Sequence, residues 1–143
     1  MFNNPAYSGA SILVAGPEFG VGSSREHAVW ALSDWGLRAV LAPSFGDIFA
    51  GNAVKDGLLP VELPAAAIAQ LWDRIEADPS ATVTVDLVEK QVAIGVSSWA
   101  FAVDDGVRRR LLEGLDDIAL TLRFRDKIES FEGQRYPFYP VVA

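Results

Sequence analysis

The chain has 143 residues, of which 50% are hydrophobic and 22% are charged, so we expect one domain with a packed core. A formal net charge of −7 argues against nucleic acid as a partner, because acidic side chains outnumber the basic ones that would neutralise phosphates. The absence of cysteine excludes disulfides and an iron–sulfur cluster on this chain's own thiolates, and a single histidine, His27, argues against a histidine-rich metal site.

The N-terminal part predicts two strands with a helix between them. Residues 10–15 are an apolar run with the length of a strand buried on both faces, which favours a parallel or mixed sheet. A glycine-rich loop then leads to a helix over residues 25–35, with Ser24 as the expected N-cap and Gly36 as a left-handed C-cap. Residues 38–42 form a second apolar strand, so this part is expected to be a βαβ-like unit.

The middle of the chain changes from helical to alternating periodicity. We expect a short helix over residues 45–50, a loop-to-strand step over 57–61 and an amphipathic helix over 64–77. After Pro79 three short runs alternate between apolar and polar residues, which predicts an antiparallel meander that packs its apolar face on the helices. The apolar positions of these runs are Val83, Val85, Leu87, Val92, Ile94, Val96, Trp99, Phe101 and Val103.

The C-terminal part predicts three short helices and a tail. The helices are expected over residues 107–113, 116–122 and 124–132, with Gly114 and Gly133 as stops. The apolar side chains expected to face the core are Leu115, Ile118, Leu122, Ile128 and Phe131. Residues 134–143 contain two prolines without a period and are expected to be extended. No stretch of the chain has the composition of a domain linker, so residues 1–143 are expected to form a single domain.

Residues 20–25, Gly-Val-Gly-Ser-Ser-Arg, lie where the first strand, the glycine-rich loop and the helix start meet. The first amides of a helix lack intrahelical acceptors and carry partial positive charge, so such a junction holds an anion by its backbone alone. Ser23 and Ser24 add two hydroxyls, and Arg25 adds a planar fork suited to a carboxylate or a phosphate. The junction is therefore suited to binding a small acid and acting on it.

The same residues also fit a purely structural interpretation. Glycines permit positive φ, serines cap helices, and Arg25 could pair with an acid such as Glu18. The stretch is not a P-loop, because the Gly-Lys-Ser/Thr ending is absent, and it lacks the third glycine of a dinucleotide-binding fingerprint. The residues alone therefore indicate an anion-holding α/β domain and leave both interpretations open.

Longer stretches of the chain resemble one enzyme family. GVGSSREHAVWAL at residues 20–32 and RAVLAPSFGDIFAGNAVKDGLLPVEL at 38–63 resemble the small subunit of 3-isopropylmalate dehydratase, which is related to the swivelling fourth domain of aconitase. GLDDIALTL at 114–122 resembles a later segment of that family, and the resemblance covers most of residues 9–132. It implies an α/β fold, the swivelling β/β/α domain of the aconitase type, with a mixed sheet flanked by helices.

The resemblance also implies a reaction and a division of labour between two chains. The family's enzyme is a hydro-lyase that isomerises 2-isopropylmalate and 3-isopropylmalate by dehydration and rehydration in leucine biosynthesis. Three cysteines of a large subunit hold a [4Fe–4S] cluster, which agrees with a chain that has no cysteine. We therefore expect no cofactor and no metal ligand on this chain, and a large subunit as its partner.

Site residues follow from the resemblance by position. Ser23 matches the serine that removes the carbon-bound proton, Ser24 matches a residue that hydrogen-bonds a substrate carboxylate, and Arg25 matches a bidentate carboxylate clamp. Gly22 is grouped with the substrate-binding residues, whereas His27 is expected to be structural. A serine hydroxyl is a weak base, so this role requires amides that stabilise its alkoxide as an oxyanion hole does.

One departure from the family leaves alternatives open. Its small subunit has an N-terminal segment before the residue that matches Tyr7, with an Asn-Val-Asp-Thr-Asp-like stretch and a substrate-recognition loop, and neither is present here. We therefore expect a shortened form that is inactive alone and has an exposed sheet edge. The same residues suit a homoaconitase-type or citraconate/methylmalate-type hydratase, and the fold alone would suit a non-catalytic carboxylate-binding scaffold subunit.

The expected partners are the cluster-bearing large subunit and a small dicarboxylate or hydroxy-acid substrate, with neither nucleic acid nor a membrane among them. No apolar run approaches the length of a bilayer span, and no signal peptide is visible. We therefore expect a cytoplasmic protein.

Overall fold

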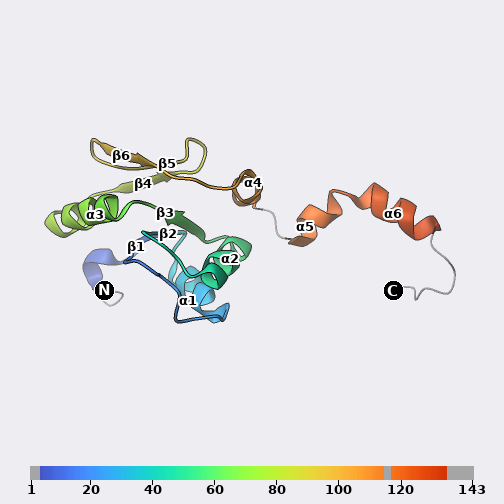
Figure 1. Cartoon of the computed structure of the whole chain (residues 1–143), viewed down its shortest axis with the longest axis horizontal. Helices are drawn as coiled ribbons and strands as arrows, with labels where there is room; N and C mark the ends of the chain where they lie inside the picture. The colour runs from blue at the N-terminus through green and yellow to red at the C-terminus, as the bar shows by residue number, and fades with distance from the viewer. Residues whose placement is uncertain (1–3, 115–116, 135–143) are drawn as a thin grey trace.

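The computed structural model describes residues 4–114 and 117–134. Its elements in chain order are the 3-10 helix η1 (Pro5–Tyr7), β1 (Ile12–Val14), α1 (His27–Trp35), β2 (Ala39–Ala42), α2 (Asp47–Asp56), β3 (Leu59–Glu62), α3 (Ala65–Ala77), β4 (Val83–Asp86), β5 (Gln91–Ile94), β6 (Ser97–Ala100), α4 (Asp105–Glu113), α5 (Asp117–Leu122) and α6 (Arg125–Gln134). Among these residues the strands form two three-stranded sheets, with α1 and α2 below the first sheet and the second sheet above it in Figure 1.

The first sheet is entirely parallel, in the order β1-β2-β3. Leu13 pairs with Val40, and Val40 pairs with Pro60. All four residues of β2 are buried, as expected for a short apolar strand covered on both faces. The predicted strand–helix–strand unit is therefore confirmed.

The two faces of β2 belong to two different hydrophobic clusters. Ala39 and Leu41 lie in a cluster with α3 and the second sheet, whereas Val40 and Ala42 lie in a cluster with α1 and α2. Successive side chains of a strand point to opposite faces, which explains the alternation. The central strand thus connects the two halves of the core.

Helices α1 and α2 begin or end away from their predicted bounds. α1 ends at Gly36 with φ of 107°, as predicted, but it begins at His27, and no side chain caps its first turn. The predicted start at Arg25 with Ser24 as N-cap is therefore wrong, because the chain continues as a turn through Glu26. α2 runs past the predicted end to Asp56, since Phe49 and Ala53 are both buried by the sheet.

The amphipathic helix and the meander are both confirmed. α3 starts directly after Pro64 and buries Ala67, Ile68 and Leu71. The second sheet has the order β4-β5-β6 and is antiparallel throughout, so parallel and antiparallel pairs lie in separate sheets rather than in one mixed sheet. Val96 was expected to face the core but is 97% exposed, because it lies in the tight turn after β5.

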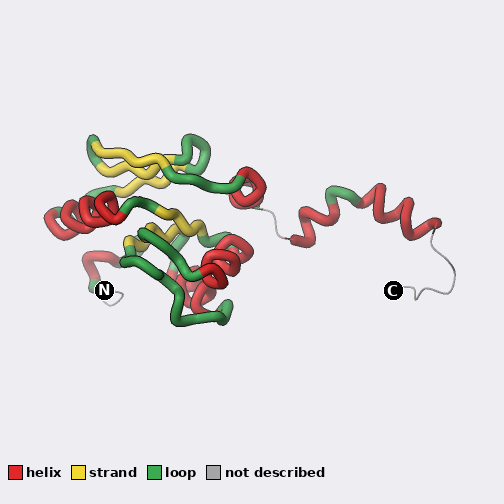
Figure 2. Tube along the Cα trace, viewed as in Figure 1, coloured by secondary structure: helices red, strands yellow, loops and turns green. Residues whose placement is uncertain are grey.

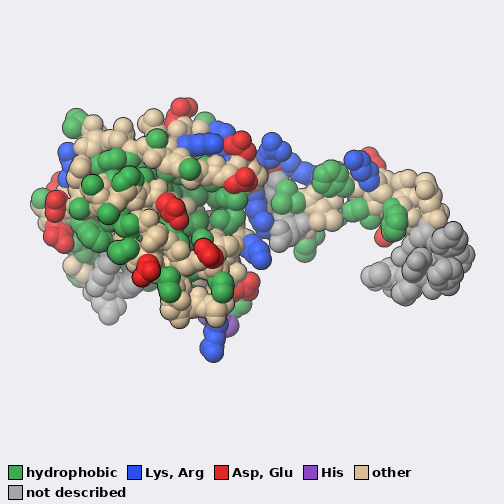
Figure 3. All heavy atoms as spheres, in the orientation of Figure 1, with side chains coloured by type: hydrophobic (Ala, Val, Ile, Leu, Met, Phe, Trp, Pro, Cys, Tyr) green, Lys and Arg blue, Asp and Glu red, His purple; other side chains and the backbone are tan. Residues whose placement is uncertain are grey.

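The C-terminal helices differ most from the prediction. α4 begins with a side-chain cap, and then α5 and α6 extend to the side of both sheets (Figures 1 and 2). The inward orientation predicted for Ile118, Leu122 and Phe131 is wrong: these side chains are 70%, 57% and 72% exposed. Figure 3 shows such hydrophobic side chains between charged ones along this arm. The segments are helical, as predicted, but no described part of the chain covers these side chains.

Further predictions concern the same C-terminal part of the chain. Ile128 is half-buried rather than buried, and Gly133 lies within α6 instead of stopping it. Leu115 and the tail at 135–143 lie outside the described residues. None of the described helices is long and apolar enough to cross a bilayer.

Candidate functional site

The predicted site residues share the loop between β1 and α1, which forms the lower edge of the molecule in Figure 2. Gly22, Ser24 and Arg25 are exposed, and Ser23 is half-buried. The structure therefore presents all four residues to solvent on one short segment. None of them is packed into either hydrophobic cluster.

Ser23 is held by contacts at both its backbone and its side chain. Its amide donates to the carbonyl oxygen of Gly20 across 3.1 Å. Its Oγ lies 3.4 Å from the Arg25 amide nitrogen and 3.4 Å from the Arg25 carbonyl oxygen, which are long distances for hydrogen bonds. The hydroxyl is thus oriented along the loop but only weakly engaged.

Several amides around Ser23 are available as donors. Within the described part of the chain, the backbone N–H groups of Gly22, Ser24, Glu26 and His27 have no acceptor. The late start of α1 leaves these groups outside the helical ladder, next to the partly positive end of the helix. The loop can therefore donate several hydrogen bonds to a bound oxyanion.

The guanidinium of Arg25 makes no ion pair or hydrogen bond with any described residue. Glu18, the acid that might have paired with it, forms no ion pair with a described residue, and its backbone amide donates to the Ser44 Oγ across 2.9 Å. Glu18 also has φ of 56°, an uncommon conformation for a residue other than glycine. The structure therefore gives no support to a structural Arg25–Glu18 pair.

The ring of His27 contacts the ring of Trp30, with 4.9 Å between the ring centroids. Among the described residues no group of three or more His, Cys, Asp or Glu side chains could hold a metal ion. The single histidine thus has a neighbour on its own helix.

A second segment, residues 43–49, supports the loop between β1 and α1, residues 15–26, which we call the serine loop. Phe19 forms an isolated parallel bridge with Phe45. The Phe19 amide donates to the Ser44 carbonyl oxygen across 3.0 Å, and the Gly46 amide donates to the Phe19 carbonyl oxygen across 2.9 Å. The only signal in the sequence was that this segment belongs to the second stretch that carries the family resemblance.

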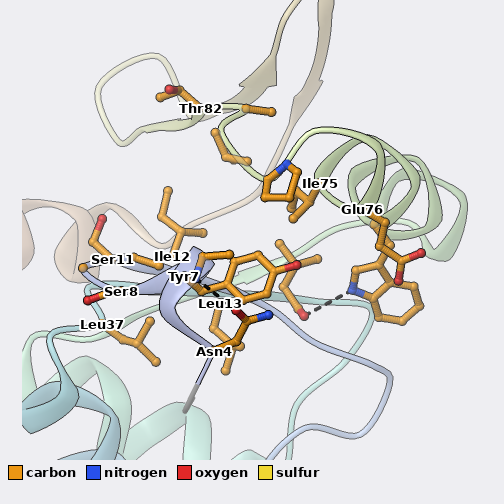
Figure 4. Close-up of a pocket in the computed structure, with 18 of the residues that line it drawn as sticks. Asn4, Tyr7, Ser8, Ser11, Ile12, Leu13, Leu37, Ile75, Glu76 and Thr82 are labelled. Atoms are coloured by element: carbon orange, nitrogen blue, oxygen red, sulfur yellow. Dashed lines mark hydrogen bonds between the residues drawn. The ribbon is translucent and has the colours of Figure 1, made fainter. Parts of the chain in front are cut away.

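A cavity of about 810 Å³ lies elsewhere, between η1, β1, the end of α3 and the start of β4. Figure 4 shows Tyr7, Leu13 and Ile75 around it. None of residues 16–26 lines this cavity, so it is separate from the predicted site. Its walls follow the outer edge of β1, where no described strand pairs.

Three family models match consecutive parts of the chain. Residues 1–66 match the aconitase C-terminal domain, and residues 69–105 match LeuD_N. Residues 117–140 match the C-terminal domain of the 3-isopropylmalate dehydratase small subunit.

Similar proteins and a similar structure bear related names. The chain is 63% identical to the 3-isopropylmalate dehydratase small subunit of Salinispora tropica over 143 residues, which is all of this chain and 73% of that protein. It is 55% identical to the protein of the same name from Acidothermus cellulolyticus, over 98% of this chain and 71% of that protein. The crystal structure of 3-isopropylmalate dehydratase from Methanocaldococcus jannaschii superposes with a TM-score of 0.62 at 31% identity, covering 85% of this chain and 68% of that one.

Proposed function

This chain belongs to the family of 3-isopropylmalate dehydratase small subunits, and we propose that it contributes the proton-accepting, carboxylate-binding half of an active site shared with a large subunit. The reaction is the dehydration and rehydration that interconverts 2-isopropylmalate and 3-isopropylmalate. In this proposal residues 1–143 act as one domain of the aconitase swivelling type, in the cytoplasm.

The observation that supports this most is the combination of groups on the loop after β1. A guanidinium without a described acidic partner, a weakly engaged hydroxyl and several unused amides lie within residues 22–27. A dicarboxylate substrate needs such donors, because each carboxylate has two oxygens that accept hydrogen bonds.

Arg25 is the proposed clamp for one substrate carboxylate. Its planar fork can donate two parallel hydrogen bonds to the two oxygens, which fixes the orientation of the carboxylate as well as its position. The Ser24 hydroxyl and the backbone at Gly22 supply further contacts beside it. This holds the carbon that loses its proton at a constant place relative to Ser23.

Ser23 is the proposed base. Its Oγ, as the alkoxide, accepts the proton from the substrate carbon, the electron pair of that C–H bond forms the carbon–carbon double bond, and the hydroxyl group leaves the adjacent carbon as hydroxide. When hydroxide adds back to the other carbon of the double bond, Ser23 returns the proton and is an alkoxide again. A serine alkoxide is stabilised here by the neighbouring amides and the start of α1, an effect worth roughly 3–4 kcal/mol per well-placed donor.

The iron–sulfur cluster does not fit this chain. A [4Fe–4S] cluster is held by cysteine thiolates, and the sequence has no cysteine. We therefore assign the cluster to the large subunit and derive no step through it.

The test is reconstitution. The chain is mixed with a cluster-loaded large subunit of a close relative, and the interconversion of 2- and 3-isopropylmalate is followed. We expect turnover by the mixture and none by the chain alone. Turnover by the isolated chain would contradict a shared site, and substrate binding by the complex without any turnover would indicate a non-catalytic scaffold subunit instead.

A further inference from the structure

The serine loop is pressed against the side chain of Phe49 on α2. Phe49 is 2% exposed, and its ring meets the ring of Phe19 edge to face, with 5.2 Å between the centroids. A Cβ atom added to Gly20 would lie 2.3 Å from the Cγ of Phe49, well inside contact distance. Only glycine therefore fits at position 20 while Phe49 keeps its place.

Gly20 in turn is bonded to Ser23. The carbonyl oxygen of Gly20 accepts the Ser23 amide across 3.1 Å, and Gly20 has φ of +81°, which places that carbonyl in a turn that other residues rarely form. One short series of contacts thus runs from the buried ring of Phe49 through Gly20 to the backbone of Ser23.

The same loop is tied to the segment just before α2 by further contacts. The Ser44 Oγ accepts the Glu18 amide, and a Cβ atom added to Gly46 would lie 3.0 Å from the Cα of Val21. These contacts hold both sides of Gly20 to the segment that leads into Phe49, so the loop has little freedom to move independently of α2.

We propose that Phe49 is a positioning residue, which sets the Ser23 hydroxyl at its reacting place by packing against Gly20. This rests on the proposed function of Ser23. Misplacing a reacting group by about 1 Å is enough to cost on the order of 10²-fold in rate. Phe49 is far from Ser23 in sequence and does not touch substrate in this proposal, so its substitution should change the rate more than the binding of substrate.

The principal variant is Phe49→Leu, which keeps an apolar side chain but removes the flat ring against Gly20. In the reconstituted enzyme we expect kcat to fall roughly 10- to 100-fold, with KM changing much less, because the long Arg25 side chain can still reach the carboxylate. A kcat equal to that of the wild type would overturn the proposal.

A second variant, Gly20→Ala, has a matched control. Gly9 has the same φ of +81°, but nothing lies within 4 Å of a Cβ built on it. Gly9→Ala thus carries the backbone cost of alanine at positive φ without the clash. We expect kcat to fall at least about 10-fold further in Gly20→Ala than in Gly9→Ala, and equal effects would count against the role of Phe49.

The double variant Gly20→Ala with Phe49→Ala tests whether the two residues act together. If they do, the fold-loss in kcat of the double variant is smaller than the product of the fold-losses of Gly20→Ala alone and Phe49→Ala alone. The reason is that removing the ring makes room for the new Cβ. Independent losses that simply multiply would contradict the proposed series of contacts.

Amide hydrogen exchange of the isolated chain separates this proposal from the proposed function. We expect faster exchange of the Val21 and Ser23 amides, which donate to carbonyl oxygens within the loop, in Phe49→Leu, with no change in the antiparallel sheet. If the reconstituted wild type shows no turnover, the proposed function fails while this measurement still decides whether Phe49 holds the loop. Unchanged exchange in the loop would reject the positioning role.

Discussion

The indole Nε1 of Trp72 donates a hydrogen bond to the backbone carbonyl oxygen of Val14 across 3.2 Å, joining α3 to the outer edge of β1. Ser11 and Ala15, on either side, direct their bonding groups toward β2. Because alternate residues of a strand face opposite edges, the Val14 carbonyl points away from β2, where no described strand pairs. The indole therefore satisfies an acceptor that the sheet leaves open.

Replacing Trp72 by Phe should lower the free energy of unfolding by roughly 1–3 kcal/mol, because it leaves the Val14 carbonyl without its donor while keeping an aromatic ring. Urea unfolding followed by far-UV circular dichroism measures this. Trp30→Phe is the control, since the Trp30 side chain is 45% exposed and makes no hydrogen bond with a described residue. Equal losses in the two variants would show that the hydrogen bond contributes nothing.

Replacing Ser23 by Ala should reduce turnover of the reconstituted enzyme by on the order of 10²–10⁴-fold, because the variant has no Oγ to accept the proton. The melting temperature should stay within about a degree or two, since the Oγ makes only long contacts within its own loop. Ser98→Ala, on the exposed side of β6, is the control for a lost serine hydroxyl. Near-normal turnover in Ser23→Ala would remove this residue from the mechanism.

Replacing Arg25 by Lys should raise KM by roughly 10-fold or more, because a lysine ammonium keeps the charge but cannot make two parallel hydrogen bonds to a carboxylate. Steady-state kinetics of the reconstituted enzyme measure the change. Arg38→Lys, another exposed arginine, should leave KM unaltered. If both variants keep the wild-type KM, the clamp is elsewhere.

The Lys90–Asp105 pair should give the chain a measurable response to acid. The Lys90 Nζ donates a hydrogen bond to Asp105 across 3.0 Å, and this bond, helped by the lysine charge, lowers the pKa of Asp105. A carboxyl whose pKa is lower in the folded state stabilises that state above its unfolded pKa of about 3.9, and the contribution is lost as the pH falls through the folded pKa.

Lys90→Met should therefore raise the pKa of Asp105 toward its ordinary value, as read from the carboxyl carbon in an NMR titration. Asp78 is an internal control: the Ser80 hydroxyl, 2.6 Å away, is the main cause of its lowered pKa, so that pKa should not move. Added salt should reduce the Asp105 shift, because both groups are at the surface. If the pKa of Asp105 is the same in Lys90→Met as in the wild type, Lys90 is not the cause of the lowered pKa.

The parts of the fold that were predictable are those where local pattern and burial agree. β2 and α3 were correctly placed because a short apolar run and a helical stripe each have one stable arrangement against a core. Periodicity says which residues share a face, but not whether anything covers that face, and this is why Ile118 and Phe131 were wrongly expected to be buried. The end of α2 was missed because Gly51 lowers local helix propensity, which burial of Ala53 overcomes.

The site was predictable only in part, for a related reason. Ser23 and Arg25 are close together in sequence, so one loop had to carry them whatever the fold. The late start of α1, which leaves the Ser24 amide unused instead of making Ser24 a cap, depends on how the loop packs. Phe49 lies on another helix, and its contact with Gly20 exists only after folding, so no local pattern could have indicated it.

The burial of β2 on both of its faces has a consequence for the thermal unfolding of the chain. Since Val40 contributes to one hydrophobic cluster and Leu41 to the other, unfolding of β2 removes a member from both clusters at once. Both should therefore be lost in a single cooperative transition. A small acid captured at one face would then raise the melting temperature of strands on the opposite face, so calorimetry could detect ligand occupancy without any catalytic assay.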